Sequence, residues 1–329
     1  MIQLYKPFQK SDFSPQTCFL TGQHLDSPED QISVFPEWIL ERYSLRDKTF
    51  KVLDESSVQY QHIKVPCAPK VIENAINPLE EEIEKAFSAG FDAVIKLPEE
   101  RLFQWMAKLM YGVVYNDMRI EGEKDTAKGN EFKLSEFLQD RFEKLHLILQ
   151  SLVVPMDFEG PKPWSIRVFK IKYSKDVFNY KDEPTNLNFS LGMNDFGIVA
   201  CLQDNGAVGI DQQEMTDKFA SKVLHPIQFE EFCARFIYSN YLLNHLAECT
   251  IRSKEEKVIV ESIPLIGTPN RSLFDNWNDD MFAQVLTDYW KPWGLTKDKI
   301  IKFPNSPNSF LENNDTYEII EPETIELPY

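Results

Sequence analysis

The sequence predicts an α+β fold, in which a small metal-free treble-clef-like module at the N-terminus precedes a larger body of helices and antiparallel strands. Apolar residues recur at helical spacing in several long stretches, and they alternate with polar residues through a β-rich stretch in the middle of the chain. The 329 residues can form one large domain or two ordinary ones. Because 24 Phe, 12 Tyr and 6 Trp stand against only 12 Gly, we expect an aromatic-rich core.

The first segment predicts short helices and strands. Its expected elements are a helix at 37–43, a strand pair at 49–53 and 57–65 with its turn at 54–56, and a helix at 70–89. Pro36 suits the first turn of the short helix. Pro78 should kink or divide the long helix, and Gly90 should end it.

The middle of the chain predicts two helices and then a sheet. The expected elements are a helix at 99–119, a loop at 121–130, a helix at 134–152, strands at 164–173, 187–191 and 197–202, a hairpin turn at 204–206 and its return strand at 207–210. The turn is expected because Asn205 and Gly206 readily adopt the positive φ angles of tight hairpins. The two glycines at 192 and 197 lie between strands, which indicates a hairpin loop and not a nucleotide site.

The last part predicts mainly helices. Its expected elements are a helix at 228–249, a short strand at 258–260, a helix at 279–289 and an acidic tail. We therefore divide the chain into an N-terminal module at 1–91, an α+β body at 92–314 and the tail at 315–329, which we expect to be mobile or loosely docked.

Charge and cysteine usage narrow the class of protein. The formal net charge of −17 disfavours direct binding to nucleic acid, because such binding relies on cations that neutralise phosphates. No apolar stretch approaches the roughly 20 residues of a membrane helix, and residues 1–7 lack the apolar core of a signal peptide. Five widely spaced cysteines are typical of free thiols in a reducing compartment, so we expect a cytoplasmic protein.

Two cysteine segments carry the one constellation that could bear chemistry. Cys18 opens the stretch Cys-Phe-Leu-Thr-Gly, and Cys67 opens Cys-Ala-Pro-Lys 49 residues later. Between them lie Ser-Val-Phe-Pro-Glu-Trp-Ile-Leu at 33–40 and the predicted strand pair. The helix that follows contains Asn74 and the sequence Leu-Glu-Glu at 79–81.

This layout resembles the HNH-type endonuclease modules of the treble-clef kind. Those modules carry a Cys-x-x-Cys knuckle followed by Gly, then Glu-His-Ile-hydrophobic-Pro entering a short helix, and then a hairpin. A second Cys-x-x-Cys follows, with an Asn beside it and a helix that ends in a Leu-Glu pair. The resemblance covers residues 15–90, about a quarter of the chain.

The zinc ligands that the resemblance implies are half missing. Cys18 and Cys67 match the first cysteine of each knuckle, whereas Thr21 and Lys70 stand where the second cysteines belong. Structural zinc needs four N or S ligands, so we expect no metal and regard the two cysteines as vestigial ligand positions. Packing would then replace a zinc contribution on the order of 10 kcal/mol. Alternatively, the two cysteines are unrelated buried thiols.

The catalytic residues that the resemblance implies are missing too. Ser33 stands at the position of the catalytic His, and Ile32 at that of the acidic residue before it. Asn74 is near the position of the Asn but out of register. HNH chemistry needs a His to activate water and a metal to neutralise the phosphate. The resemblance therefore implies a copy that has lost zinc and nuclease activity together.

Other candidate sites are weaker. His245 and Cys249 are four residues apart on a predicted helix and could present two ligands together, but no further ligand can be assigned. Trp290 and Trp293 place two indoles close together, which core packing at a helix end explains. The sequence holds no Gly-rich phosphate loop and no Gly-x-Ser-x-Gly motif.

The leading hypothesis is a non-catalytic protein, descended from an HNH-type nuclease, that acts through a protein partner and needs no cofactor. A second hypothesis is an enzyme whose site lies in the C-terminal body, near the sheet and His245. A third is an acidic mimic that binds a DNA-binding protein. The sequence assigns no catalytic residue under any of the three.

Overall fold

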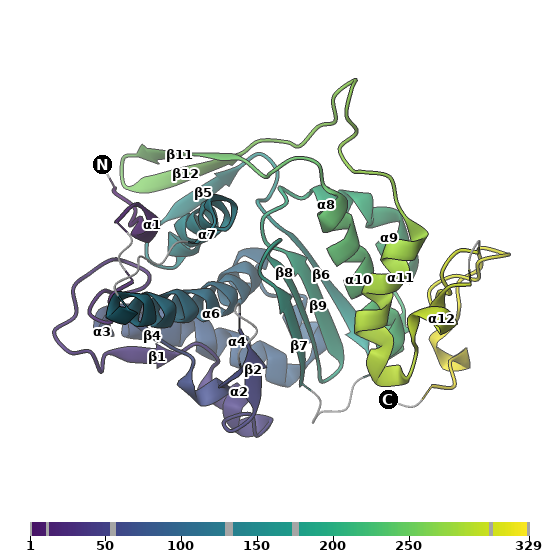
Figure 1. The fold of residues 1–329 in the computed structure, drawn as a ribbon, viewed down its shortest axis with the longest axis horizontal. Helices are drawn as coiled ribbons and strands as arrows, with labels where there is room; N and C mark the ends of the chain where they lie inside the picture. The colour runs from purple at the N-terminus through teal and green to yellow at the C-terminus, as the bar shows by residue number, and fades with distance from the viewer. Residues whose placement is uncertain are drawn as a thin grey trace. The chain divides into compact units, whose positions relative to one another are not determined.

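Helices combine with mixed and antiparallel sheets in the computed structural model, which confirms the α+β class (Figure 1). The structure describes residues 2–10, 13–52, 57–128, 134–172, 178–302 and 305–327. Within these ranges no helix is both long enough and apolar enough to cross a membrane. The turn predicted at 54–56 lies outside the described residues.

The chain forms two compact units, and neither follows chain order. Unit 1 consists of Met1–Ala89, Lys96–Glu159 and Cys249–Glu261, and unit 2 of Gly90–Ile95, Gly160–Glu248 and Ser262–Tyr329. Each compact unit therefore combines segments that are far apart in the sequence. The domain boundaries predicted at 91 and 314 stay predictions.

Short strands and helices begin unit 1. Its elements up to residue 89 are α1 (Pro7–Lys10), β1 (Gln31–Ser33), α2 (Glu37–Arg42), β2 (Thr49–Lys51), β3 (Ser57–Gln59), η1 (Tyr60–His62), β4 (Lys64–Pro66), α3 (Pro69–Val71), η2 (Ile72–Ile76) and α4 (Asn77–Ala89). β2 pairs with β3 as the predicted hairpin, and β1 pairs antiparallel with β4. The single strand predicted over 57–65 is wrong. The Tyr60 ring packs on Phe35 and Phe50. The turn η1, which begins at Tyr60, separates β3 from β4.

The helix predicted over 70–89 is divided. The π-helical segment η2 runs directly into α4, and Pro78 lies just after this junction, so the division is a change of helix type within a continuous helical run. Gly90 follows the helix with a φ of 88°, as a glycine stop should.

Two long helices and a small sheet complete unit 1. These elements are α6 (Glu99–Lys128), α7 (Glu136–Leu149), η3 (Gln150–Leu152), β5 (Met156–Glu159), β11 (Cys249–Lys254) and β12 (Lys257–Ser262). The loop predicted from residue 121 is wrong, because α6 continues to Lys128. Gly122 alone costs only about 1 kcal/mol in a helix, and most of its neighbours are good helix formers.

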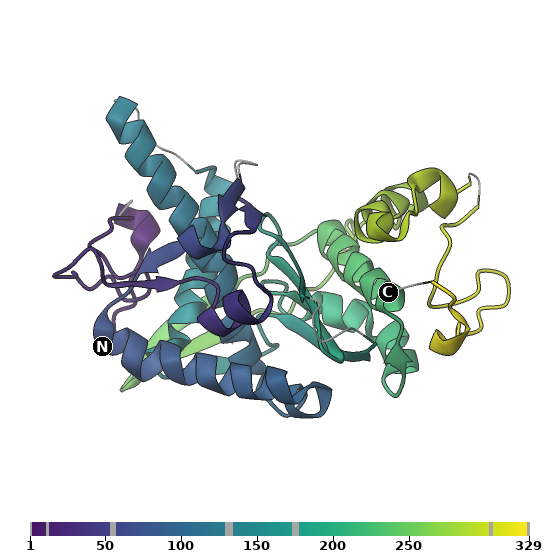
Figure 2. The ribbon, with the colours of Figure 1, turned by 90° about the horizontal axis from the view of Figure 1, so that it is seen from below.

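Unit 2 is a five-stranded sheet with helices on one face. Its elements are α5 (Phe91–Val94), β6 (Ser165–Ile171), β7 (Phe178–Glu183), β8 (Asn188–Met193), β9 (Phe196–Cys201), α8 (Ala207–Asp211), α9 (Gln213–Phe219), β10 (Val223–Leu224), α10 (Pro226–Leu242), α11 (Asp279–Trp290), η4 (Lys291–Trp293), α12 (Lys297–Ile300) and η5 (Pro322–Thr324). The strand order is β10-β6-β9-β8-β7. α8, α10 and α11 cover the same face of this sheet (Figures 1 and 2).

Several predictions for unit 2 are confirmed. Residues 192–197 form the predicted hairpin connection, with Gly192 opposite Gly197 in the β8–β9 ladder. Trp290 is fully buried and Trp293 packs against the same core at the end of α11. The acidic tail, which we expected to be mobile or loosely docked, instead contacts the start of α10, where Gln228 donates to the main-chain oxygen of Ile320 and Lys222 forms an ion pair with Glu321.

The predicted helix over 228–249 is wrong at its C-terminal end. α10 stops at Leu242 because Leu243 is extended and Asn244 donates to the carbonyl of Leu273. His245 therefore lies beyond the helix, while Cys249 begins β11 in the other unit. These two residues share no helix face, so the ligand pair considered from their spacing does not exist.

The return strand predicted at 207–210 is also wrong. Asn205 and Gly206 do have positive φ angles, 48° and 78°, but the chain then enters α8. The buried Asp204 carboxylate caps this helix by accepting from the N–H groups of Gly206 and Val208. The Ser165 hydroxyl donates to the same carboxylate at 2.6 Å.

We expect Asp204 to make the protein less stable as the pH rises from about 4 to about 6. Burial raises the pKa of Asp204 from 3.8 to about 6, so across this window the folded chain holds a proton that the unfolded chain has lost. Relative to Asp204→Asn, the wild-type free energy of unfolding should fall by up to about 3 kcal/mol between pH 4 and pH 7. Chemical denaturation of both proteins measures the difference, and parallel pH profiles would contradict it.

Candidate functional site

A tight turn at residues 17–24, here called the knuckle turn, presents Cys18. Thr17 and His24 form an antiparallel β-bridge. The main-chain N–H of Cys18 donates to the carbonyl of Gln23, and the main-chain N–H of Gly22 donates to the carbonyl of Cys18. Gly22 has a φ of 70°, and a Cβ at this position would lie 2.3 Å from the Tyr5 ring. Glycine is therefore required here for both conformation and space.

The fold brings the knuckle turn to Cys67. Phe19 N–H donates to the Pro66 carbonyl at 2.8 Å, so the turn adds to the end of β4 immediately before Cys67. Cys18 and Cys67 are both fully buried, and the Cys67 thiol donates to the Ala68 carbonyl at 3.9 Å. We call these two residues the thiol pair.

The two thiols have opposite pKa shifts. Interaction with Cys67 lowers the pKa of Cys18, and hydrogen bonds from the Thr21 hydroxyl and from the N–H groups of Ala68 and Leu20 lower it further, against the effect of burial. Interaction with Cys18, together with burial, raises the pKa of Cys67. Negative charge is therefore favoured on Cys18 and disfavoured on Cys67.

The structure tests whether these residues fit zinc. Cys18, Thr21 and Cys67 come together, whereas Lys70 is exposed on α3. Among the described residues, no group of three or more His, Cys, Asp and Glu side chains could hold a metal ion. Two sulfurs and a hydroxyl do not make the closed four-ligand site that structural zinc needs.

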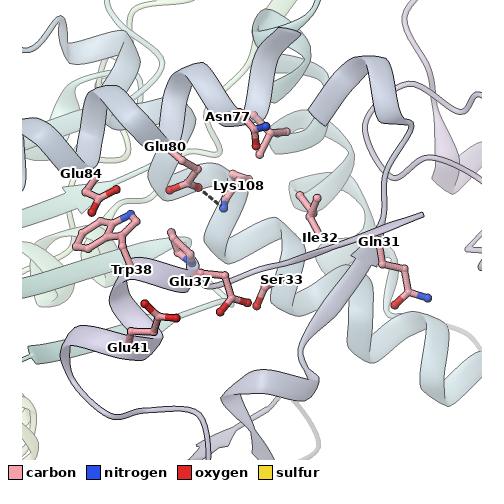
Figure 3. A pocket seen from close by; sticks show the side chains of 12 residues that line it. Gln31, Ile32, Ser33, Glu37, Trp38, Glu41, Asn77, Glu80, Glu84 and Lys108 are labelled. Carbon is pink, nitrogen blue, oxygen red and sulfur yellow. Dashed lines mark hydrogen bonds and ion pairs between the residues drawn. The ribbon is translucent and has the colours of Figure 1, made fainter. Parts of the chain in front are cut away.

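A pocket of about 560 Å³ lies between β1 and α2 on one side and α4 on the other (Figure 3). β1 pairs with β4, the strand that ends just before Cys67. Its lining residues are Gln31, Ile32, Ser33, Pro36, Glu37, Trp38, Glu41, Ile76, Asn77, Glu80, Glu84 and Lys108. Ser33 and Ile32, which the resemblance sets at the catalytic positions, are both in this wall. Asn74 is not, and Asn77 lines the pocket instead.

Carboxylates dominate this pocket, which we call the acidic pocket. Glu37 and Glu41 lie on α2, and Glu80 and Glu84 on α4 (Figure 3). Lys108 is the one cationic side chain among the lining residues. A phosphate would therefore meet net repulsion in the pocket, and a cation net attraction.

Lys108 forms an ion pair with Glu80. Its ammonium donates to the Glu80 carboxylate, and the side chain is only 2% exposed (Figure 3). Trp105 Nε1–H donates to the other oxygen of Glu80 at 3.1 Å. Arg46, outside the lining, bonds both Glu37 and Glu41. Glu84 has no ion-pair partner among the described residues.

Two buried donors in the pocket wall are not used. Ser33 Oγ and Trp38 Nε1 are inaccessible to solvent and have no hydrogen-bond partner within the described part of the chain. A buried donor without a partner costs about 1–3 kcal/mol. The wall therefore carries unused hydrogen-bonding groups as well as excess negative charge.

Sequence reasoning missed Glu84, Trp38 and Lys108 as pocket residues. Lys108 did leave a signal, because it is a single cation in the apolar run 102–114. A charge on the buried face of a helix indicates a paired partner, which proves to be Glu80. Nothing in the sequence pointed to Trp38 or Glu84 as neighbours of that pair.

Unit 2 contains a separate buried polar cluster. The Lys181 ammonium lies 4.0 Å from the centre of the Tyr289 ring, and the Ser190 hydroxyl donates to the Lys181 carbonyl at 3.4 Å. Burial raises the pKa of Cys233 and of Tyr289. Both groups therefore hold their protons at neutral pH, which makes them poor nucleophiles.

Comparison of the chain with family models, curated proteins and solved structures finds no match. The interpretation of the acidic pocket and of the thiol pair therefore depends on their own geometry and chemistry.

We predict that Lys108→Met destabilises the protein by about 2–3 kcal/mol, because it leaves the Glu80 carboxylate without its cation. The loss should lie somewhat below the 3–5 kcal/mol of a fully buried pair, since Glu80 is 16% exposed. Urea denaturation measures the change.

The matched control is Lys144→Met, which removes the exposed ion pair with Asp140 in the same unit. It should cost less than about 0.5 kcal/mol. Equal losses in the two variants would show that the Lys108–Glu80 pair contributes no more to the free energy of unfolding than the exposed Lys144–Asp140 pair.

Proposed function

We propose that the protein is a non-catalytic, HNH-like binding protein whose acidic pocket holds a basic side chain of a protein partner. The observation that carries this proposal is the pocket lining. Ser33 stands where the resemblance expects the catalytic His. Four carboxylates line the pocket against two cations, Lys108 and Arg46, which pair with Glu80 and with Glu37 and Glu41, so Glu84 is left without an ion-pair partner among the described residues. Such a site lacks the histidine of HNH chemistry and repels phosphate, but it suits an ammonium or guanidinium group.

The order of elements supports the proposed ancestry. The knuckle turn, β1, the short helix α2, the β2–β3 hairpin, Cys67 and the helix α3–α4 follow one another in the order that the resemblance implies. The same sign of charge disfavours nucleic acid as the direct partner.

A reducing compartment, the cytoplasm, fits the proposal. All five cysteines are free, including Cys18 and Cys67. The acidic-mimic hypothesis would share the preference for basic partners, since DNA-binding proteins present Lys and Arg. The enzyme hypothesis has less support, because Cys233 and Tyr289, the candidate nucleophiles near Lys181 in unit 2, are buried and protonated.

A lysine-rich peptide should bind Glu84→Gln about threefold to fivefold more weakly than wild type, because one exposed ion pair contributes up to about 1 kcal/mol. Fluorescence anisotropy of a labelled Gly-Lys-Gly-Lys-Gly peptide at constant salt measures the affinity. The matched control is Glu81→Gln, which makes the same charge change on an exposed residue of α4 that does not line the pocket. Equal effects of the two variants would reduce the binding to general charge attraction and refute the pocket.

Purified protein should contain no stoichiometric zinc and should not cleave DNA with Mg²⁺, Mn²⁺ or Zn²⁺. Two thiols cannot supply the four ligands of a zinc knuckle, and Ser33 cannot replace the base. Elemental analysis and a plasmid-nicking assay provide the readouts. One equivalent of tightly bound zinc, or metal-dependent cleavage abolished by Cys18→Ser or Cys67→Ser, would contradict the proposed loss of function.

A further inference from the structure

Exposed hydrophobic side chains gather on one part of unit 2. Six of the ten large hydrophobic side chains that are exposed within the described part of the chain lie in two short segments, 241–246 and 263–281. These six are Tyr241, Leu246, Ile263, Ile266, Trp277 and Met281, and we call them the apolar surface. None of them lines the acidic pocket. Such a concentration of exposed hydrophobic groups marks an interaction site, whereas scattered ones need no explanation.

Main-chain hydrogen bonds hold the two segments together. Asn244 N–H donates to the Leu273 carbonyl at 2.8 Å. Asp275 N–H donates to the Leu242 carbonyl, also at 2.8 Å. The six exposed side chains therefore belong to one region of unit 2, although β11 and β12 separate the two segments in the sequence.

The buried Tyr238 fixes the aromatic part of this surface. Its ring stacks with Tyr241 at a centroid distance of 6.3 Å and makes an edge contact with Trp277 at 4.6 Å. Its hydroxyl donates to the Asn278 carbonyl and accepts from the Asn278 N–H, both at 3.2 Å. Tyr241 and Trp277 are thus held in place while they remain 63% and 39% exposed. Side chains that are already ordered lose little conformational entropy when a partner covers them.

The loop that precedes α11 adds an isoleucine to this surface. In Figure 1 the loop projects beyond α8 and α10. Two main-chain hydrogen bonds close its tip, from Thr268 N–H to the Arg271 carbonyl at 2.7 Å and from Arg271 N–H to the Thr268 carbonyl at 3.1 Å. Ile266 comes just before this turn and is 73% exposed. Burial of Ile266 against another molecule would remove a large apolar area from water.

The apolar surface is also nearly free of charge. Residues 241–246 and 263–270 contain no Asp, Glu, Lys or Arg, although the chain has a formal net charge of −17. Two copies of so acidic a chain repel each other, and this repulsion is weakest where charge is absent. A lipid surface fits less well, because Arg271 is the one Lys or Arg in 263–281 and anionic membranes attract clusters of basic residues.

We propose that the apolar surface is the contact through which two copies of this chain associate. Tyr, Trp and Met are enriched in the buried centres of protein interfaces, where charged residues are depleted. Most homo-oligomers are two-fold symmetric dimers in which the same surface of each copy meets itself. Each copy would therefore supply Ile266 and Trp277 to one contact, and a second copy is present wherever the protein is made.

Sedimentation velocity of the 329-residue protein at roughly 1–100 μM tests the proposal, because this range reveals a dissociation constant of micromolar strength. Wild type should form dimers. Ile266→Asp should weaken association by at least about tenfold, since the contact would then bury an unpaired carboxylate. The matched control is Ile210→Asp, which makes the same change on α8 of the same unit at a residue that is 75% exposed and outside the apolar surface. This control should leave the dissociation constant unchanged, and circular dichroism checks that both variants are folded.

Salt provides a second readout. Association of two acidic chains through an apolar contact should persist or strengthen from about 0.05 M to about 0.5 M NaCl, because salt screens their repulsion. Wild type that stays monomeric at every concentration, equal weakening by Ile266→Asp and Ile210→Asp, or dissociation at high salt would each overturn the proposal. A monomer that floats with phosphatidylcholine vesicles, and loses this with Ile266→Asp, would also overturn it and assign the surface to lipid.

Discussion

One main-chain hydrogen bond, from Phe19 N–H to the Pro66 carbonyl, ties the knuckle turn to β4 and so places both candidate sites. β4 pairs on its other side with β1, which sets Ser33 opposite Lys64 at the pocket wall. The Phe19 carbonyl accepts from His146 Nε2 at 2.9 Å, so both main-chain groups of this residue are used. Burial lowers the pKa of His146 to about 3, which keeps its ring neutral in this role.

Much of the fold could be predicted from local pattern, because amphipathic periodicity records which face of an element is buried. Helices such as α2, α7 and α11 were found in this way. The errors lie where a distant contact decides the local structure. Asn205–Gly206 has the angles of a hairpin, yet the Asp204 carboxylate captures the following N–H groups and begins a helix. Likewise, α10 ends where Asn244 bonds Leu273, 29 residues further along the chain.

The candidate sites were partly predictable. The resemblance led to the prediction that Cys18 and Cys67 each occupy the first position of a knuckle, and the two segments do lie together, through the hydrogen bond from Phe19 N–H to the Pro66 carbonyl. The acidic pocket could not be foreseen, because its walls come from β1–α2, α4 and α6, and their separation depends on packing. Lys108 joins the two sites physically, since its ammonium pairs with Glu80 in the pocket and also acts electrostatically on Cys67.

The division into interleaved units has a consequence for synthesis of the chain. β12 pairs in parallel with β5 across about 100 residues of sequence, so unit 1 stays incomplete on the ribosome until residues 249–261 have emerged. All of Gly160–Glu248, most of unit 2's sheet and helices, is made within that interval. Completion of unit 1 therefore depends on a segment that is made after most of unit 2, and a fragment ending at residue 159 would leave one edge of β5 without its partner strand.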